Sequence, residues 1–262
     1  MTQRAYAHTA DGATRPPWLG LLRQRLWDAL PSQCLMCHAW PSQALCPECE
    51  PLCWQTAPRR CPRCALHLPG SSDVCAACLR NAPVLARCYA AVDYSPPWDG
   101  VVQQLKFHQQ PAWASLVAHY LVRTPGVAAC LQQADVVLPV PLAPARLRDR
   151  GYNQSALIAK QLLTSLQPTP APTLRQCVLL RLTDTPAQSQ LGRAARLRNL
   201  RHAFALDPAA SASLRGQRVV LVDDVMTTGA TLSTLANRLL AHGVYAVDAI
   251  VFARTPAPHW ND

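Results

Sequence analysis

VVLVDDVMTTGATL, the stretch from Val219 to Leu232, predicts the fold of this 262-residue chain. Its four leading aliphatic residues form a continuous apolar run, which is typical of a strand buried on both faces of a parallel sheet. Asp223 and Asp224 stand where this strand is expected to end, and a hydroxyl-rich loop follows them. Apolar residues then recur at helical spacing as far as Gly243. Strand, acidic pair, loop and helix make half of a βαβ unit, whose ligands bind at the carboxyl edge of the sheet.

The loop has the chemistry of a phosphate site. Its backbone N–H groups and hydroxyls can donate to a phosphate at the positive end of the helix. Asp223 and Asp224 would repel that phosphate, but they suit ribose hydroxyls or a hydrated Mg²⁺, so a sugar phosphate fits better than a free anion. The alternative, an ordinary strand–turn–helix, leaves two adjacent acids after a buried strand without a ligand, which is costly. The stretch resembles the phosphoribosyl pyrophosphate (PRPP) loop of type I phosphoribosyltransferases, with phosphate-binding residues expected at Thr227, Thr228, Gly229, Ala230 and Thr231.

Composition limits the class of protein. The chain is half apolar, enough for a real core, and carries a formal net charge of +10, nearly all of it from arginine. That charge favours polyanionic partners such as nucleic acid or nucleotides, the alternative being a soluble basic protein from an arginine-rich proteome. No apolar stretch is long enough to span a membrane, and the N-terminus lacks the apolar core of a secretory signal. We therefore expect a cytoplasmic location.

The chain is expected to have three parts. Residues 1–33 read as a tail with a short amphipathic helix at Trp18–Leu30, which docks on its own domain or touches a membrane surface. Residues 34–80 are expected to form a double zinc ribbon. The composition changes after residue 80, and residues 84–255 are expected to form an α/β domain, with a parallel sheet flanked by helices.

Four C-x-x-C pairs lie between residues 34 and 78. Two such pairs supply four thiolates for a tetrahedral Zn²⁺, so the four pairs predict two structural zinc ions. A zinc ribbon is too small to bury a core of its own, so metal binding would supply its folding free energy. Disulfides are the alternative, but the expected location does not favour them, and redox chemistry needs fewer pairs. Pairs adjacent in sequence are expected to share an ion, with an interleaved arrangement as the alternative. The expected ligands are Cys34, Cys37, Cys46, Cys49, Cys61, Cys64, Cys75 and Cys78, and the remaining cysteines, Cys53, Cys88, Cys130 and Cys177, are expected to be structural.

The rest of the second domain reads as alternating strands and helices. Strands are expected at 88–94, 136–138, 178–182 and 247–253, helices at 112–122 and 155–166, and a helix or hairpin at 101–107. Prolines after residue 138 stop that strand and shape a loop, and Arg146, Arg148 and Arg150 follow. Residues 184–200 are polar and basic, with Arg193 and Arg196 on one helical face. Beside a phosphate loop, these arginines favour a binding role over a solvated basic face.

The whole arrangement resembles the competence protein F (ComF) family, which joins a double zinc ribbon to a phosphoribosyltransferase-like domain. The motifs that carry the resemblance are the four C-x-x-C pairs, LKF at 105–107, LPVPL at 138–142, RGYNQ at 150–154, TPAQSQLGRxxRxxN from 185 to 199, and VDDVMTTGAT from 222 to 231. The resemblance implies PRPP with Mg²⁺ as ligand, and contacts to pyrophosphate from the loop at Val140. It also implies a part in natural transformation, handling incoming single-stranded DNA, with other DNA-uptake proteins as candidate partners.

Two classes of function follow. As an enzyme, the protein would move a phosphoribosyl group from PRPP to an acceptor, with Asp223 and Asp224 holding the ribose and stabilising its cationic transition state. The pyrophosphate would then be held by the arginines from Arg146 to Arg150, or by Arg193 and Arg196. As a DNA-binding competence protein, it would carry a competent PRPP site without necessarily catalysing transfer, and this is the reading we favour, because no base-reading residue marks an acceptor pocket. A Rossmann dehydrogenase is excluded, since no G-x-G-x-x-G follows a strand.

Overall fold

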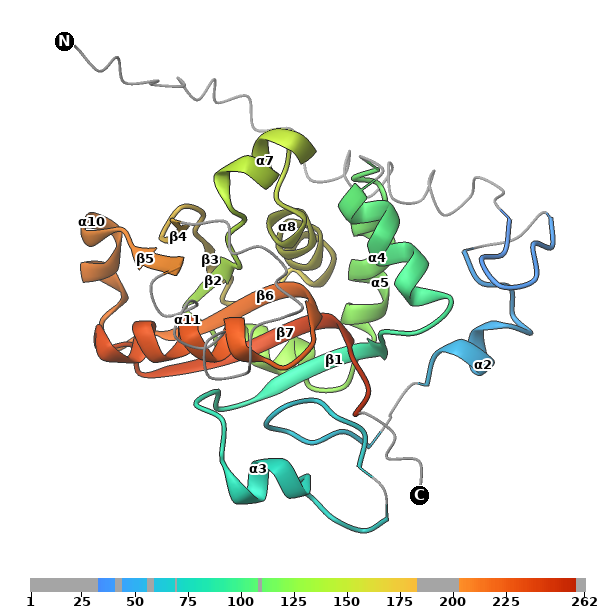
Figure 1. The fold of residues 1–262 in the computed structure, drawn as a ribbon, viewed down its shortest axis with the longest axis horizontal. Helices are drawn as coiled ribbons and strands as arrows, with labels where there is room; N and C mark the ends of the chain where they lie inside the picture. The colour runs from blue at the N-terminus through green and yellow to red at the C-terminus, as the bar shows by residue number, and fades with distance from the viewer. Residues whose placement is uncertain are drawn as a thin grey trace, which may run out of the picture. The chain divides into compact units, whose positions relative to one another are not determined.

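The computed structural model describes residues 33–40, 44–55, 59–68, 70–107, 110–182 and 203–257. The chain divides into two compact units, Met1–Glu50 and Pro51–Asp262. The first unit contains the first two cysteine pairs, whereas the second contains the other two pairs and the entire sheet (Figure 1). The expected helix at 18–30 and the basic stretch at 184–200 lie outside the described residues. None of the described helices is both long and apolar enough to cross a membrane.

A five-stranded sheet forms the centre of the second unit, and all of its strands are parallel. Its strands are nearly continuous runs of aliphatic residues, as expected when both faces of a sheet are covered. The order is β1 (Cys88–Asp93), β7 (Ala246–Arg254), β6 (Arg218–Met226), β2 (Val136–Pro139) and β3 (Thr173–Leu174). A separate antiparallel pair joins β4 (Leu179–Arg181) to β5 (Phe204–Leu206). The α/β prediction with a parallel sheet is therefore confirmed.

Helices connect the strands. The longer ones are α4 (Trp98–Phe107), α5 (Trp113–Val122), α8 (Gln154–Leu166) and α11 (Ala230–Ala241). The shorter ones are α2 (Glu50–Cys53), α3 (Ala76–Arg80), α6 (Val127–Gln132), α7 (Pro144–Arg150), α10 (Pro208–Ser211) and the 3-10 turn η1 (Ala212–Leu214). The stretch at 101–107, expected as a helix or a hairpin, is helical. Neither α6 nor α7 is expected from the apolar pattern, because both are short.

Two apolar layers cover the two faces of the sheet. Alternate residues of the strands, among them Val219 and Leu221, form one buried cluster with the leucines of α11, with Phe204 of β5 and with Cys61, Cys64 and Cys78. On the other face Trp98 of α4 packs edge-on against Phe252 of β7, with ring centroids 5.7 Å apart. Helices α5 and α8 also contact the sheet and each other (Figure 1). The second cysteine group is therefore part of the main core.

Strand β6 is longer than the sequence pattern predicts. It continues through Asp223 and Asp224 to Met226, because its parallel pairing with β7 persists to Met226 and Arg254. The loop then spans only residues 227–229, and α11 begins at Ala230. The acidic pair thus belongs to the rigid strand rather than to the loop.

Replacing Leu221 tests the packing of this core. Leu221 is fully buried at the centre of β6, so Leu221→Ala should lower the free energy of unfolding by about 2–5 kcal/mol through lost contacts and a cavity. Chemical denaturation in the presence of zinc measures the change. The matched control is Leu79→Ala on α3, where 72% of the residue is exposed and the change should stay within about 0.5 kcal/mol. Equal losses for both variants would contradict the assignment of the core.

Candidate functional site

The acidic pair at the end of β6 is held from two helices. The hydroxyl of Ser155, at the start of α8, donates to Asp223 Oδ1 at 2.9 Å, and the backbone N–H of Asp224 donates to the same oxygen at 3.0 Å. Lys106, in the last turn of α4, places Nζ 3.0 Å from Asp224 Oδ2. Asp224 is only 3% exposed, so its charge needs this partner. The pair is therefore fixed from several directions.

One carboxylate oxygen retains capacity for a ligand. Asp224 Oδ1 accepts from the backbone N–H of Val225 at 2.8 Å. Asp224 Oδ2 lies against the ammonium of Lys106, but among the described residues it accepts no aligned hydrogen bond. A buried carboxylate oxygen in this state suits a hydroxyl donor or a hydrated cation. These residues therefore fit the Mg²⁺ that the sequence pattern implies.

Burial and the neighbouring charge of Asp224 raise the pKa of Asp223 to about 7. The hydrogen bond from Ser155 and the charge of Lys106 act in the opposite direction, but they do not outweigh the other two effects. The carboxyl is therefore poised between its two protonation states near neutral pH. A cation bound to the pair would favour the charged form.

The loop after β6 is shaped for close approach of a ligand. Gly229 has φ of 77°, and a Cβ at this position would meet the Met226 side chain at 2.4 Å, so only glycine fits without strain. Thr227 and Thr228 are exposed, and Thr228 Oγ1 accepts from the N–H of Ala230 at 3.3 Å. Helix α11 begins directly behind them, so its unpaired N–H groups lie at the carboxyl edge of the sheet. This geometry is typical of phosphate binding.

The loop after β2 lies beside the end of β6. The N–H of Val140 donates to the carbonyl of Val222 at 2.9 Å, so Val140 is fixed to the strand that carries the acidic pair. Asn153 donates through Nδ2 to the Val140 carbonyl at 3.0 Å, and its Oδ1 caps α8 by accepting from the N–H of Ser155 at 3.0 Å. One asparagine thus links the predicted pyrophosphate loop to the helix that contacts Asp223.

The predicted arginines are only partly described. Helix α7 carries Arg146, which is exposed, and Arg150, which is half-buried and donates to Gln154. Burial lowers the pKa of Arg150, and the charge of Asp224 opposes this shift. Arg193 and Arg196 lie outside the described residues.

Sequence reasoning assigned no role to Lys106 or Ser155. Lys106 lies more than a hundred residues before Asp224 in the chain, and only the fold brings the two together. A weak signal exists, because Lys106 and Lys160 are the two lysines of an otherwise arginine-rich chain. Ser155 directly follows the RGYNQ motif, but nothing in that motif points to an aspartate.

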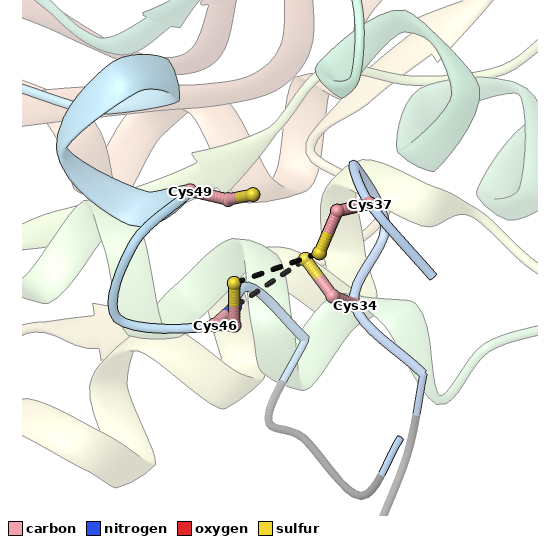
Figure 2. A group of neighbouring side chains, drawn as sticks. All are labelled: Cys34, Cys37, Cys46 and Cys49. Atoms are coloured by element: carbon pink, nitrogen blue, oxygen red, sulfur yellow. Dashed lines mark hydrogen bonds between the residues drawn. The ribbon is translucent and has the colours of Figure 1, made fainter. Parts of the chain in front are cut away.

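The eight paired cysteines form two groups, and each group joins pairs adjacent in sequence. Cys34, Cys37, Cys46 and Cys49 form the first group, and Cys61, Cys64, Cys75 and Cys78 the second; within each, all four sulfurs lie within 4.8 Å of one another. Figure 2 shows the first group, in which Cys37 and Cys46 have sulfurs 3.7 Å apart and the N–H of Cys46 donates to Cys34 Sγ. In the second group Cys64 and Cys75 have sulfurs 3.5 Å apart.

These distances fit a metal better than a disulfide. A tetrahedral Zn²⁺ with bonds of about 2.3 Å holds neighbouring sulfurs about 3.8 Å apart, whereas a disulfide needs about 2.05 Å. Burial alone would raise the thiol pKa values, but backbone N–H donors from both C-x-x-C pairs of each group lower the pKa of Cys34 to about 6 and that of Cys61 to about 7. The pKa values of Cys49 and Cys78 are raised instead, the first by its hydrogen bond with Cys46 and the second by burial. Four thiolates therefore need a cation between them.

Comparison with known proteins finds relatives along most of the chain. A family described as "Phosphoribosyl transferase domain" matches residues 153–260. The chain is 32% identical over 239 residues to "DNA utilization protein YhgH" of Escherichia coli K12, covering 86% of this chain and 98% of that protein. It is 31% identical over 197 residues to "Competence protein F" of Haemophilus influenzae, covering 74% and 84%. Among solved structures, a hypoxanthine phosphoribosyltransferase from Staphylococcus aureus aligns with a TM-score of 0.35 and 13% identity, over 53% of this chain and 61% of its own.

Metal analysis tests the two cysteine groups. We expect the purified protein to carry two zinc ions per chain, one in each group. Replacing Cys61 and Cys64 with serine should remove one ion, whereas the control Cys53→Ser with Cys177→Ser, outside both groups, should leave both ions bound. Elemental analysis measures the stoichiometry. Metal-free protein with all eight thiols in disulfides would contradict the assignment.

The raised pKa of Asp223 makes a prediction about stability. A carboxyl with a raised pKa binds its proton more tightly in the folded state, so its contribution to stability is lost as pH rises from about 4 through about 7. Asp223→Asn removes this loss and should raise the free energy of unfolding by about 2–4 kcal/mol near pH 8, and by less near pH 5.5. Denaturation at both pH values measures the difference. Asp73→Asn, at an exposed acid, is the control, and an Asp223→Asn gain that is equal at both pH values would contradict the prediction.

Proposed function

The chain belongs to the competence protein F family, as its similarity to most of the length of the two relatives named above shows, and we propose that it handles single-stranded DNA during uptake. In this proposal it also binds PRPP with Mg²⁺ at the carboxyl edge of β6. Both ligands are polyanions, in keeping with a net charge of +10. The proposed setting is the cytoplasm, where thiolates remain reduced and can hold zinc. Other DNA-uptake proteins are the proposed partners.

The observation that carries the PRPP proposal is the acidic pair beside the exposed threonine loop. Asp224 is buried, its Oδ2 accepts no aligned hydrogen bond among the described residues, and Asp223 lies next to it in a rigid strand. Without a ligand, burial and then the repulsion of the adjacent Asp224 carboxylate both disfavour the charged form of Asp223, and they raise its pKa. A ribose with its Mg²⁺ supplies the hydroxyl donors and the positive charge that this arrangement lacks.

Each part of the site has a proposed role. The N–H groups and hydroxyls of residues 227–231 hold the 5-phosphate, and Asp223 and Asp224 hold the ribose hydroxyls, with Lys106 limiting the repulsion between the acids. The backbone at Val140, with Arg146 and Arg150 of α7, contacts the pyrophosphate. Arg193 and Arg196 are proposed to add to this contact. Bound Mg²⁺ would neutralise part of the pyrophosphate charge.

DNA handling is proposed from the relatives and from the charge. The relatives are named for DNA utilization and for competence, and a basic protein binds a phosphate backbone with little dependence on sequence. Aromatic residues make up only 6% of the chain, so phosphate contacts are expected to outweigh stacking on the bases.

A second candidate is a phosphoribosyltransferase that acts on a base or nucleotide. It is favoured by the complete acidic pair, because carboxylates next to the ribose stabilise the cationic character that develops when the pyrophosphate leaves. In that reaction the bond from the ribose carbon to pyrophosphate breaks and a bond to the acceptor forms.

One double variant separates the two ligands. Asp223→Asn with Asp224→Asn keeps the side-chain size but removes two charges, and each lost charge-assisted hydrogen bond should weaken PRPP binding roughly ten- to a hundredfold. Affinity for single-stranded DNA should hold or rise slightly, because the protein becomes more positive. Calorimetry with PRPP and Mg²⁺ measures the first effect, and titration with an oligonucleotide the second.

The control variant also removes two negative charges, but at positions outside β6 and its loop. Asp73→Asn with Asp135→Asn should leave PRPP binding unchanged. If the wild-type protein gives no heat with PRPP and Mg²⁺ at roughly millimolar concentration, the proposed PRPP site is wrong. If it binds PRPP, release of pyrophosphate with candidate bases or oligonucleotides, dependent on Asp223 and Asp224, identifies a transferase.

A further inference from the structure

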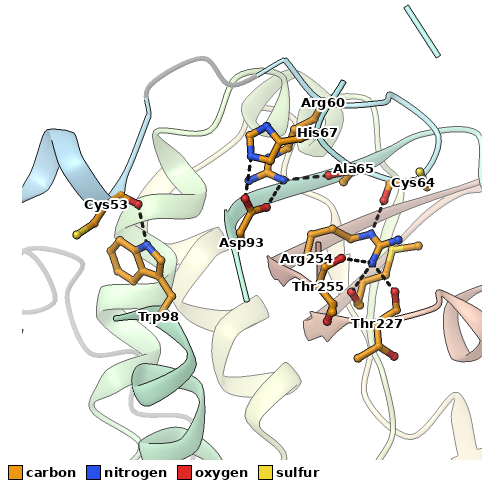
Figure 3. Close-up of polar contacts among 11 residues, drawn as sticks. Cys53, Arg60, Cys64, Ala65, His67, Asp93, Trp98, Thr227, Arg254 and Thr255 are labelled. Carbon is orange, nitrogen blue, oxygen red and sulfur yellow. Dashed lines mark hydrogen bonds and ion pairs between the residues drawn. The ribbon is translucent and has the colours of Figure 1, made fainter. Parts of the chain in front are cut away.

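Arg254, the last residue of β7, is buried against the start of the threonine loop. It is 6% exposed, and among the described residues no carboxylate pairs with it. Its guanidinium donates to backbone carbonyls instead: Nε to Cys64 at 2.8 Å, and Nη1 to Met226 at 3.0 Å, to Thr255 at 2.8 Å and to Thr227 (Figure 3). A buried cation is tolerated only when acceptors surround it in this way.

Two of these acceptors are the carbonyls of Met226 and Thr227, at the point where β6 becomes the loop. Fixing both carbonyls fixes the peptide planes that lead into residues 227–229, and with them the direction of the N–H groups that follow. The Met226 side chain packs against Gly229, and its sulfur lies 3.5 Å from Cys88 Sγ. Arg254 therefore holds the loop from the interior of the protein, and the exposed side chains of Thr227 and Thr228 remain accessible to a ligand.

Another carbonyl that accepts from Arg254 is that of Cys64, a member of the second cysteine group. Cys64 lies in the turn at residues 61–65, here called the knuckle. The flanking residues Arg60 and His67 fix this knuckle to the sheet by contacting Asp93 at 2.8 and 2.9 Å (Figure 3). Arg60 also donates to the carbonyl of Ala65 at 3.1 Å. Asp93 and Arg254 are partners across β1 and β7, so two neighbouring strand ends hold one knuckle.

We propose that Arg254 is a positioning residue for the PRPP loop, and that through the Cys64 carbonyl it makes the affinity of that loop depend on the second cysteine group but not on the first. The inference rests on the proposed PRPP site. Loss of metal from the second group would remove one constraint on this knuckle, whose remaining contacts include those with Asp93 and Arg254, so the Cys64 carbonyl would shift and the peptides at 226 and 227 would loosen. The first group belongs to the other compact unit, and among the described residues none of the carbonyls that accept from Arg254 comes from it.

Arg254→Lys tests the direct contact. Lysine keeps the charge, but its compact ammonium cannot reproduce the planar fork that reaches several carbonyls at once. Amide hydrogen exchange in residues 226–231 should accelerate, and PRPP should bind roughly ten- to a hundredfold more weakly. The matched control is Arg175→Lys, at a partly buried arginine that donates to Ser213 Oγ at 2.5 Å and lies outside both cysteine groups and the loop. Equal acceleration in both variants would overturn the role of Arg254.

A pair of cysteine variants tests the dependence on metal without changing Arg254. Cys75→Ser with Cys78→Ser disables the second group while leaving residues 61–65 intact, and Cys46→Ser with Cys49→Ser does the same to the first. Each should lose one zinc ion. Only the former should accelerate exchange at 226–231 and weaken PRPP binding, and it should do so while exchange in β2 stays slow, which shows that the sheet is still folded.

The outcomes distinguish this inference from the proposed function. If wild-type protein binds PRPP, and neither Arg254→Lys nor the second-group variant changes loop exchange or affinity, the positioning role is wrong while the PRPP site stands. If both cysteine variants weaken PRPP binding equally, the link through Cys64 is wrong. If wild-type protein does not bind PRPP, the proposed function fails, and the exchange data alone then decide whether Arg254 holds the loop.

Discussion

The structure depends on the cost of placing two negative charges side by side at the buried end of a strand. Asp223 and Asp224 cannot be separated, because they are consecutive residues of β6 and the pairing of that strand with β7 continues past both of them to Met226. Their repulsion is offset by Lys106 from α4 and by Ser155 from α8, so two helices must pack on this face of the sheet with their polar residues in register. The parallel topology supplies that register, because it brings the chain to the same edge after each strand.

Local patterns were enough to predict the parts of the protein that are themselves local. The aliphatic run of β6, the acidic pair and the loop glycine occupy adjacent positions, and the C-x-x-C spacing predicts which cysteines meet. The contacts of Lys106 and Arg254 could not be predicted in this way. Lys106 meets Asp224 only through the fold, and the acceptors of Arg254 are backbone carbonyls, which every residue possesses and which leave no trace in a sequence. The apolar pattern ends β6 too early, because the end of this strand is set by its pairing with β7 and not by apolar residues.

The two cysteine groups are alike in sequence but differ in what surrounds them. The cysteines of the first group lie in the other compact unit, and none of them belongs to the core cluster that the described residues form. Cys61, Cys64 and Cys78 of the second share a cluster with Leu85, Val219 and the leucines of α11. Spacing alone could not reveal this difference, because ligand geometry is the same in both groups. A metal in the second position would therefore stabilise a knuckle that the sheet also supports.

The shared core around Cys61 and Cys78 bears on how this architecture is inherited. A segment that only touches its neighbour can be lost, duplicated or exchanged between lineages without harm to either part. A segment whose side chains fill part of its neighbour's hydrophobic core cannot be lost in this way. Removing the second cysteine group would leave Leu85 and the adjacent strand residues exposed to water. The second cysteine group and the sheet should therefore be gained or lost together in related proteins. In the described part of the chain no cysteine of the first group belongs to this cluster, so this particular constraint does not extend to it.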